Sequence, residues 1–217
     1  MRKAGVLVAA VVAAISVVAC DDIVGSERGS GDVTTDSRDV SGFTEIVVLG
    51  SGEVVVDVTG SESLTIEAED NIIPLLTTEV ENGRLELGAK SSISPTKPIR
   101  YTITAAQLDG ASISGSGNVV ATGVDTDAFD VEINGSGSVT STGTSGALSV
   151  EISGSGDYSG EGLTSEVGSV RISGSGAAVV NVTDDLDIEI SGSGDVAYLG
   201  DPTVSQSISG SGDVTQR

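Results

Sequence analysis

The tripeptide Gly-Ser-Gly recurs along this chain at a nearly constant spacing, and this repeat limits the possible folds more than any other feature. The last six copies begin 20, 19, 20, 18 and 18 residues apart. A fixed period near 19 residues is typical of stacked structural repeats, in which each unit packs on its neighbours. The copies begin at Gly29, Gly50, Gly115, Gly135, Gly154, Gly174, Gly192 and Gly210.

Apolar and polar residues alternate on both sides of each tripeptide. The positions four before and four after its first glycine are mostly apolar, with Gln206 as an exception, and the residues between them are mostly polar. Alternation with period two predicts strands that have one buried face. In every copy except the one at Gly29, the position two before the first glycine is aliphatic: Val48, Ile113, Ile133, Ile152, Ile172, Ile190 and Ile208.

One such strand–turn–strand unit cannot bury its apolar face alone, but a stack of units can. Stacking places like residues above one another at roughly 4.8 Å. The sequence therefore predicts an all-β fold, a single-stranded parallel β-helix with rungs of 18–20 residues. Its interior would consist of Val, Ile, Leu and Ala, since aromatic residues make up 2% of the chain. Propeller blades need about 40 residues each, and a sandwich of hairpins would not produce such uniform columns. If the alternation continues through the turn, both glycines point inward and the serine points outward.

The N-terminus has the pattern of an export signal. Arg2 and Lys3 precede an apolar run from Val6 to Ala19, and the segment ends in Val-Val-Ala-Cys20, which resembles a bacterial lipobox. Residues 1–19 are therefore predicted to be a lipoprotein signal peptide, with Cys20 as the lipidated residue. An ordinary signal peptide or an uncleaved anchor is the alternative. Acyl chains on Cys20 would hold the exported protein at the periplasmic face of a membrane or at the cell surface.

The rest of the chain divides into a tether and a solenoid. Residues 20–40 are polar and are predicted to be a flexible tether, with a frayed first coil beginning at residues 29–33 as the alternative. Residues 41–217 are predicted to form the solenoid, with degenerate coils over 41–106 and regular Gly-Ser-Gly coils over 107–217. A short helical turn is expected near 71–77, around Pro74. No polar cap is evident beyond Val214, so the end of the solenoid is expected to be open. Either Gln206, Asp213 and Arg217 blunt it, or another envelope protein or a second copy, giving a homo-oligomer, covers it.

Composition excludes several functions. The chain has no His and its single Cys is assigned to lipid, which excludes His-based triads and imidazole metal sites. Without residues 1–19 it carries 8 basic and 32 acidic residues, so nucleic acid is not an expected partner. Paired carboxylates on adjacent rungs, as in polysaccharide-cleaving β-helices, remain a distant alternative. Tyr158 and Tyr198 fall in inward columns and are assigned to the core. We expect no enzyme activity and no cofactor.

Three outward columns carry polar or charged side chains, and two of them are candidates for binding. In the column three after each origin, Asp195 and Asp213 are vertical neighbours and are calcium candidates, or they cap local backbone. A second column has Arg171 between Glu151 and Glu189, which indicates charge compensation. The third is a hydroxyl row that would meet a repeating ligand such as a glycan or ice, or that only provides small residues for tight turns: Ser116, Ser136, Ser155, Ser175, Ser193 and Ser211.

These features together resemble a known bacterial family. They are the lipobox, the segment from Ser41 to Ile46, Gly50-Ser51-Gly52, the segments 71–76 and 95–99, and the serial Ile-Ser-Gly-Ser-Gly-Asp-Val units. The chain resembles the head GIN domain of putative auto-transporter adhesins from about Val40 to Arg217. The resemblance implies a right-handed β-helix on an envelope protein and supplies no catalytic residues.

From these observations we expect a lipid-anchored, non-catalytic envelope protein that presents a rigid solenoid for binding or adhesion to an envelope protein or a glycan. A structural or assembly module that docks through the open end of the solenoid is the alternative.

Overall fold

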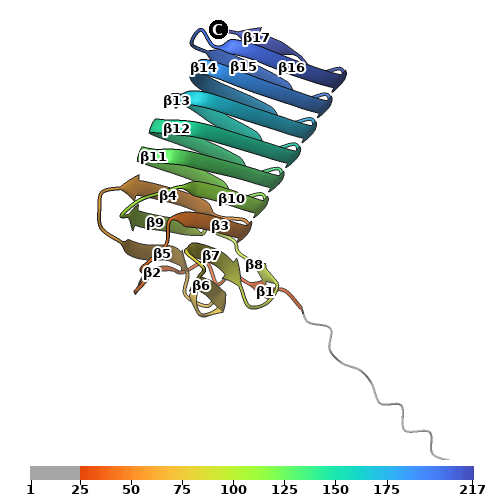
Figure 1. Ribbon diagram of the computed structural model, residues 1–217. Coiled ribbons are helices and arrows are strands. Elements are labelled where there is room, and N and C mark those ends of the chain that lie inside the picture. Colours follow the sequence, from red (N-terminus) through yellow and green to blue (C-terminus); the bar gives the residue numbers. More distant parts are fainter. Residues whose placement is uncertain (1–24) are drawn as a thin grey trace, which may run out of the picture.

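The computed structural model describes residues 25–217, which form a rod of stacked β-coils (Figure 1). The signal peptide at 1–19 and Cys20 lie outside the described residues. The regular part of the rod is a parallel sheet that winds upward one coil at a time. Its strands are β10 (Gly110–Gly115), β11 (Asn118–Gly135), β12 (Ser138–Gly154), β13 (Asp157–Gly174), β14 (Ala177–Gly192), β15 (Asp195–Leu199), β16 (Thr203–Gly210) and β17 (Val214–Gln216).

Like residues stack on like residues along the rod, as the repeat predicts. Ile133 pairs with Ile152, which pairs with Ile172, and the column continues to Ile190 and Ile208. The side chains of Ile133, Ile152 and Ile190 are 0% exposed and Ile172 is 1% exposed. Burial of each such side chain contributes roughly 1.5–3 kcal/mol. The parallel β-solenoid is therefore confirmed, and this column is the centre of its core.

The two glycines of each turn have different roles. The first has a positive φ, +129° at Gly154 and +135° at Gly174, which only glycine adopts without strain. The second lies buried, and a Cβ at Gly156 would overlap Ile133. The prediction that both point inward therefore holds for the second glycine only. The first is half-buried because the left-handed backbone turns the chain at this position.

The N-terminal part closes the lower end of the rod with antiparallel strands. Strands β3 and β4 form a parallel coil in which β3 pairs with β10 and β4 pairs with β11. On their other side, β7 pairs with β3 and β9 pairs with β4, again in parallel. Antiparallel strands follow: β5 and then β2 below β9, and β6 beside β7. The elements are β1 (Glu27–Arg28), β2 (Val33–Arg38), β3 (Glu45–Gly50), β4 (Glu53–Val58), β5 (Ser63–Glu69), η1 (Ile73–Leu75), β6 (Leu76–Glu81), β7 (Arg84–Ala89), β8 (Ile93–Ser94) and β9 (Arg100–Ala105).

The prediction of degenerate coils over 41–106 is therefore wrong in part. Strands β6 and β7 form a hairpin around Asn82 and Gly83, whose φ values are +52° and +81°. An Asn-Gly pair between strand segments is a strong hairpin signal, because both residues tolerate the left-handed conformation of a two-residue turn. The helical turn expected near 71–77 is present as the single 3₁₀ turn η1, which has Pro74 at its first turn.

The flexible tether predicted over 20–40 is also corrected for its described part. β1 pairs with β8 in parallel, and β2 pairs along its full length with β5. The polar composition of β2 is misleading because this edge strand has little of its side-chain surface buried. The buried carboxylate of Glu69 fastens the same segment, since it accepts hydrogen bonds from the backbone N–H groups of Gly31 (2.7 Å) and Thr96 (2.8 Å). The folded domain therefore begins before residue 41.

Residues 25–217 contain no helix that is long and apolar enough to cross a membrane.

Candidate functional site

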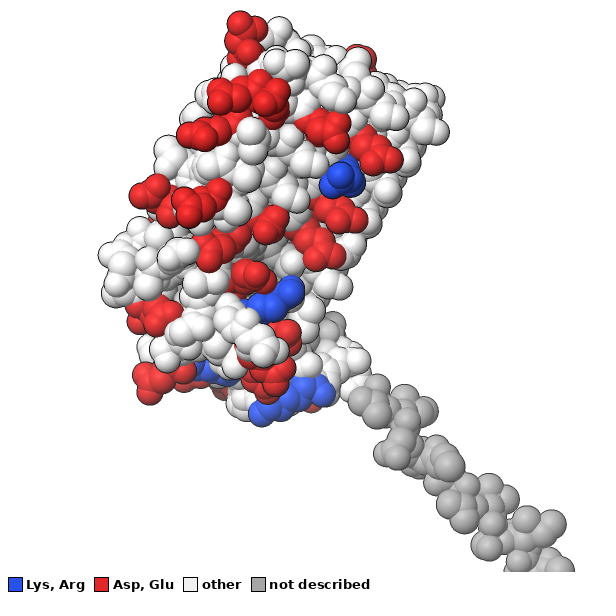
Figure 2. Space-filling model, viewed as in Figure 1, with Lys and Arg blue, Asp and Glu red and all other residues white. Residues whose placement is uncertain are grey.

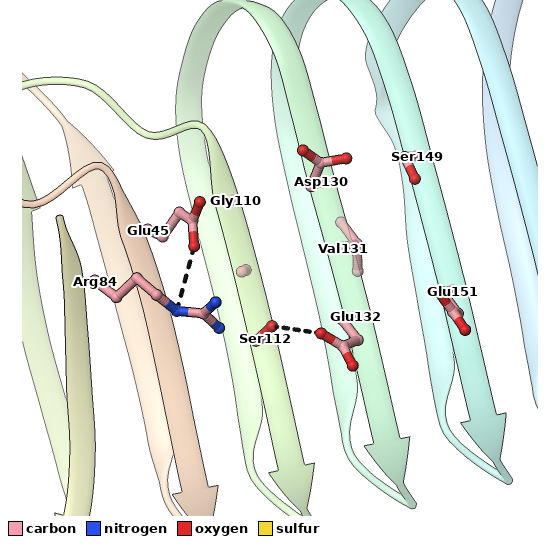
Figure 3. Close-up of a pocket in the computed structure, with 10 residues that line it drawn as sticks. Glu45, Arg84, Gly110, Ser112, Asp130, Val131, Glu132, Ser149 and Glu151 are labelled. Atoms are coloured by element: carbon pink, nitrogen blue, oxygen red, sulfur yellow. Dashed lines mark hydrogen bonds and ion pairs between the residues drawn. The ribbon is translucent and has the colours of Figure 1, made fainter. Parts of the chain in front are cut away.

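A shallow groove of about 250 Å³ crosses the wall formed by β7, β3, β10, β11 and β12 (Figure 3). Gly110 is one of its lining residues and is buried: a Cβ there would come within 3.0 Å of the Asp130 carbonyl oxygen and 3.4 Å of Glu45 Cγ, so a larger residue would crowd the wall at this point. Successive coils place side chains around the groove at the spacing of the ladder. The lining residues that carry charge or hydroxyl groups are Glu45, Arg84, Ser112, Asp130, Glu132, Ser149 and Glu151.

Carboxylates outnumber cations in this groove. Arg84 Nε lies 3.4 Å from Glu45 Oε2 and forms an ion pair with it. Arg84 Nε is buried and donates no hydrogen bond within the described residues. Glu132 accepts hydrogen bonds from Ser112 Oγ (3.4 Å) and Asn134 Nδ2 (2.6 Å). The groove therefore offers several oxygen acceptors and one guanidinium donor, a combination suited to hydroxyl-rich or amine-bearing ligands.

Carboxylates of neighbouring coils, Glu132 and Glu151, do face the same groove, so one requirement of carboxylate-based hydrolysis is met. The groove has no aromatic side chain among its lining residues. Tyr158 is instead 1% exposed, as the sequence predicts, and burial raises its pKa to about 12. Tyr198 is half-buried and packs against the core. The two tyrosines expected in the core are therefore not sugar-stacking platforms on this wall.

A second hollow lies at the adjacent corner and is lined by four aspartates, Asp109, Asp125, Asp127 and Asp130, with Gln107 and Thr126. Burial disfavours the charged form of Asp109, but hydrogen bonds from Gln107, Thr126 and Thr44 outweigh this and lower the pKa of its carboxyl. The donor atoms Gln107 Nε2 and Thr126 Oγ1 lie 2.7 and 2.6 Å from Asp109 Oδ1. Asp109 therefore fastens the loop before β10 to the corner of β11.

The two calcium candidates lie on adjacent coils, and each accepts a backbone hydrogen bond. Asp195 Oδ1 accepts from the N–H of Asp213 at 3.0 Å, and Asp213 Oδ1 accepts from the N–H of Val214 at 3.1 Å. Within residues 25–217 no three acidic or sulfur side chains are grouped so as to hold a metal ion. Asp213 therefore caps its own local backbone, whereas Asp195 caps the backbone of the next coil.

The serine row predicted from the repeat lies on the surface along one edge of the rod. The serine backbone N–H groups donate to the first glycine of the coil below, as from Ser155 to Gly135 at 2.9 Å and from Ser175 to Gly154 at 2.8 Å. In the charged column, Arg171 Nε lies 3.6 Å from Glu189 Oε2, with both side chains more than half exposed. Figure 2 shows acidic side chains spread over the visible face and basic side chains concentrated near the N-terminal end.

Sequence reasoning missed the groove around Gly110. Its floor depends on β7 lying beside β3, a pairing between residues about 40 positions apart in the chain. The one signal of the groove in the sequence is Gly110 itself. It stands in register with Asp130 and Ser149, so this column has a side chain on the coils above but none at Gly110. Arg84 reaches this wall only because the β6–β7 hairpin folds under the solenoid.

Solved structures with a similar fold span nearly the whole chain. A putative adhesin from Bacteroides fragilis has a TM-score of 0.69 and 24% identity, covering 88% of this chain and 99% of that one. A putative adhesin from Parabacteroides distasonis has a TM-score of 0.58 and 23% identity, covering 89% and 100%. A putative lipid binding protein from the same species has a TM-score of 0.55 and 24% identity, also covering 89% and 100%. These identities support a shared fold.

No curated protein matches the sequence. The family model described as "Putative auto-transporter adhesin, head GIN domain" matches residues 42–202, which is more than half of the chain. Most of the stacked coils and of the positive-φ glycines of the repeat lie within the residues that this family model matches. The chain belongs to the family of head GIN domains of putative auto-transporter adhesins.

Proposed function

We propose that this protein is a non-catalytic envelope adhesin, anchored by lipid on Cys20, which presents the wall of its solenoid to a hydroxyl-rich ligand. The family match supports an adhesin-like, exported protein. The lipid anchor rests on the lipobox alone, and the ligand class rests on the groove around Gly110. An envelope glycan has the chemistry that this groove would recognise.

The observation that carries the proposal is the direction of the rod. The described chain begins beside β1 at the capped N-terminal end, and the coils then rise away from it to β16 and β17 (Figure 1). A lipid on Cys20 would therefore hold the capped end near a membrane, and the polar walls would project from it. Each coil extends the rod by roughly 4.8 Å without adding a flexible joint.

Anchoring is tested on the full chain in its own cells. Cys20→Ser is expected to abolish incorporation of labelled palmitate and to release the domain from membranes, because Cys20 is the only thiol. Protease treatment of intact cells is expected to remove the wild-type domain if it is displayed outside. Palmitate label retained in the Cys20→Ser variant would contradict the anchor.

Ligand binding is tested on a glycan array with the membrane-extracted full chain. Glu132→Gln and Glu151→Gln keep the size of the side chains but weaken the charge-assisted acceptors of the groove. Each is expected to reduce glycan retention about tenfold or more. Glu166→Gln is the matched control, because Glu166 is also exposed but does not line the groove. Equal retention by all variants would exclude this groove, and no retention of the wild type would exclude a glycan ligand.

A second candidate function is assembly through the C-terminal end of the solenoid. One observation favours it: Ile208 is 39% exposed in the last coil, whereas Ile190 directly beneath it is 0% exposed.

A further inference from the structure

The last coil of residues 25–217 has a free edge. Strand β16 pairs with β14 on one side, and within residues 25–217 no strand covers its other side. The residues that continue the core column, Val204, Gln206 and Ile208, are half-buried or exposed there. An uncovered strand normally carries charges that prevent pairing with another chain.

Strand β16 lacks such charges, although the strand beneath it has them. In β14, three carboxylates stand directly below β16, and a hydroxyl replaces each of them. The register places Thr203 over Asp185, Ser205 over Asp187 and Ser207 over Glu189. All eight residues from Thr203 to Gly210 are uncharged in a chain whose formal net charge is −22.

The edge strands at the other end of the rod show the opposite pattern. Strand β2 carries Asp36 and Arg38, and strand β6 carries Glu79 and Glu81. These charges oppose edge-to-edge pairing. The acidic surface is therefore interrupted at the edge of β16, where a like-charged copy would otherwise be repelled. The other edge strand of this coil, β17, is also uncharged, but it has only 3 residues and stands between Asp213 and Arg217.

The sequence of this edge is symmetric about Gln206. Ser205 and Ser207 flank it, Val204 and Ile208 follow, and Thr203 and Ser209 complete the pattern. An antiparallel pair of identical strands around a two-fold axis places each residue opposite its mirror position. Val204 would then face Ile208 of the second copy, the serines would face serines, and the two Gln206 side chains would face each other.

The backbone groups of β16 are oriented for this pairing. In a parallel ladder, successive residues direct their N–H and C=O groups alternately to the two neighbouring strands. Ser211 donates its N–H downward to Gly192, so the odd-numbered residues of this coil face β14. Val204, Gln206 and Ile208 therefore direct their N–H and C=O groups to the free edge, where two copies of Gln206 would exchange a pair of hydrogen bonds.

We propose that a second copy of this chain docks tail to tail on β16, with antiparallel pairing centred on Gln206. The pair of glutamine amides, each both donor and acceptor, would fix the register, as a single buried polar residue does in coiled coils. The two N-terminal caps would lie at opposite ends of the doubled rod. If each copy is anchored by lipid on Cys20, as the proposed function states, this arrangement would join two copies whose anchors lie in opposing membranes.

The docking is tested by a single cysteine in the full chain, in membranes under a mild oxidant. Gln206→Cys places two thiols across the two-fold axis, where the Cα separation of about 5.5 Å permits a disulfide. We expect a disulfide-linked homodimer on a non-reducing gel. Ser155→Cys is the control, because Ser155 is exposed in the middle of the rod, and the wild type gives the background from Cys20.

A second measurement does not depend on the stability of the cysteine variant. Ser207→Glu restores the charge found in the same column on β14, and is expected to weaken the wild-type dimer at least tenfold by sedimentation of the detergent-extracted chain. Ser173→Glu adds the same charge at an exposed position of β13, away from the edge and outside the groove, and is expected to leave the dimer unchanged.

Three results would each overturn the proposal: a wild type that stays monomeric at all concentrations, equal effects of the two glutamate substitutions, or cross-linking of the Gln206→Cys variant to a different protein. Glycan binding by the groove is a separate readout, so the proposed function can fail while the dimer persists, and the reverse.

Discussion

Tyr158 and Ser141 lie on neighbouring coils, and their hydroxyl groups share a hydrogen bond of 2.7 Å inside the core. Their side chains are 1% and 0% exposed. The serine lies where an interior position is otherwise aliphatic, and it satisfies a phenol that would lack a partner. Tyr158→Phe is expected to lower the free energy of unfolding by about 1–2 kcal/mol, because it leaves Ser141 without a partner.

A double-mutant cycle with Ser141→Ala checks this assignment by denaturant unfolding. Removal of both hydroxyls should cost less than the sum of the two single substitutions, since neither buried group is then left unsatisfied. Additive effects would mean that the hydrogen bond contributes no coupling.

Alkaline pH should destabilise the fold through two tyrosines. Burial raises the pKa of both Tyr101 and Tyr158 to about 12. The unfolded chain ionises near pH 10, so their contribution is complete below about pH 10 and is lost as the pH rises toward 12. Titration by absorbance of the phenolate should show ionisation near pH 12 that Tyr158→Phe reduces. A titration completed by about pH 10.5 would contradict this.

Alanine substitutions at two turn glycines distinguish the cost of backbone strain from the cost of steric overlap. Gly50 and Gly154 both have positive φ, +104° and +129°. A Cβ at Gly50 would meet no atom within 4 Å, whereas a Cβ at Gly154 would overlap the carbonyl group of Gly135. Gly50→Ala is expected to cost about 1–3 kcal/mol from strain alone, and Gly154→Ala should cost more. Equal melting temperatures of the two variants would show that the coils move apart easily.

Acid should loosen the N-terminal cap through Glu69. The hydrogen bond from the Thr96 side chain, with those from the backbone N–H groups of Thr96, Gly31 and Lys97, lowers the pKa of the Glu69 carboxyl despite desolvation. A lowered pKa in the folded state gives stability that is present above the unfolded value of about 4.3 and is lost as the pH falls through the folded value.

Glu69→Gln should therefore remove part of the acid sensitivity of the cap. Hydrogen exchange of residues 27–38 at about pH 6 and pH 3 measures the effect. The wild type is expected to lose protection at the lower pH, and the Gln variant to show weak protection at both. An unchanged wild-type pattern at pH 3 would exclude Glu69 as the fastener.

Arg171 interrupts a column of glutamates on the wall of the solenoid. Arg171→Glu would place four carboxylates in succession at roughly 4.8 Å, from Glu132 to Glu189. The expected loss of stability is about 1 kcal/mol or less, because the column is exposed, and added salt should reduce it further. Arg171→Gln is the control for loss of the cation alone. A loss that salt does not change would point to packing rather than charge.

The sequence by itself determined the repeating part of this protein. Gly-Ser-Gly at a fixed period and one aliphatic column are local signals that every coil repeats, so the stack, the register of Ile133 on Ile152 and the inward Tyr158 could be predicted. The helical turn at Ile73–Leu75 followed from Pro74 and its neighbours.

Only the tertiary structure decided what happens where the repeat stops. The pairing of β2 with β5, the position of β7 beside β3 and the groove around Gly110 join segments far apart in the chain, and each such pairing depends on which strands have already been covered. The symmetry of β16 about Gln206 is written in the sequence, but it acquires meaning only at an uncovered edge. Local alternation specifies which face of a strand is buried, whereas the choice of neighbour depends on the free edges that the rest of the fold leaves.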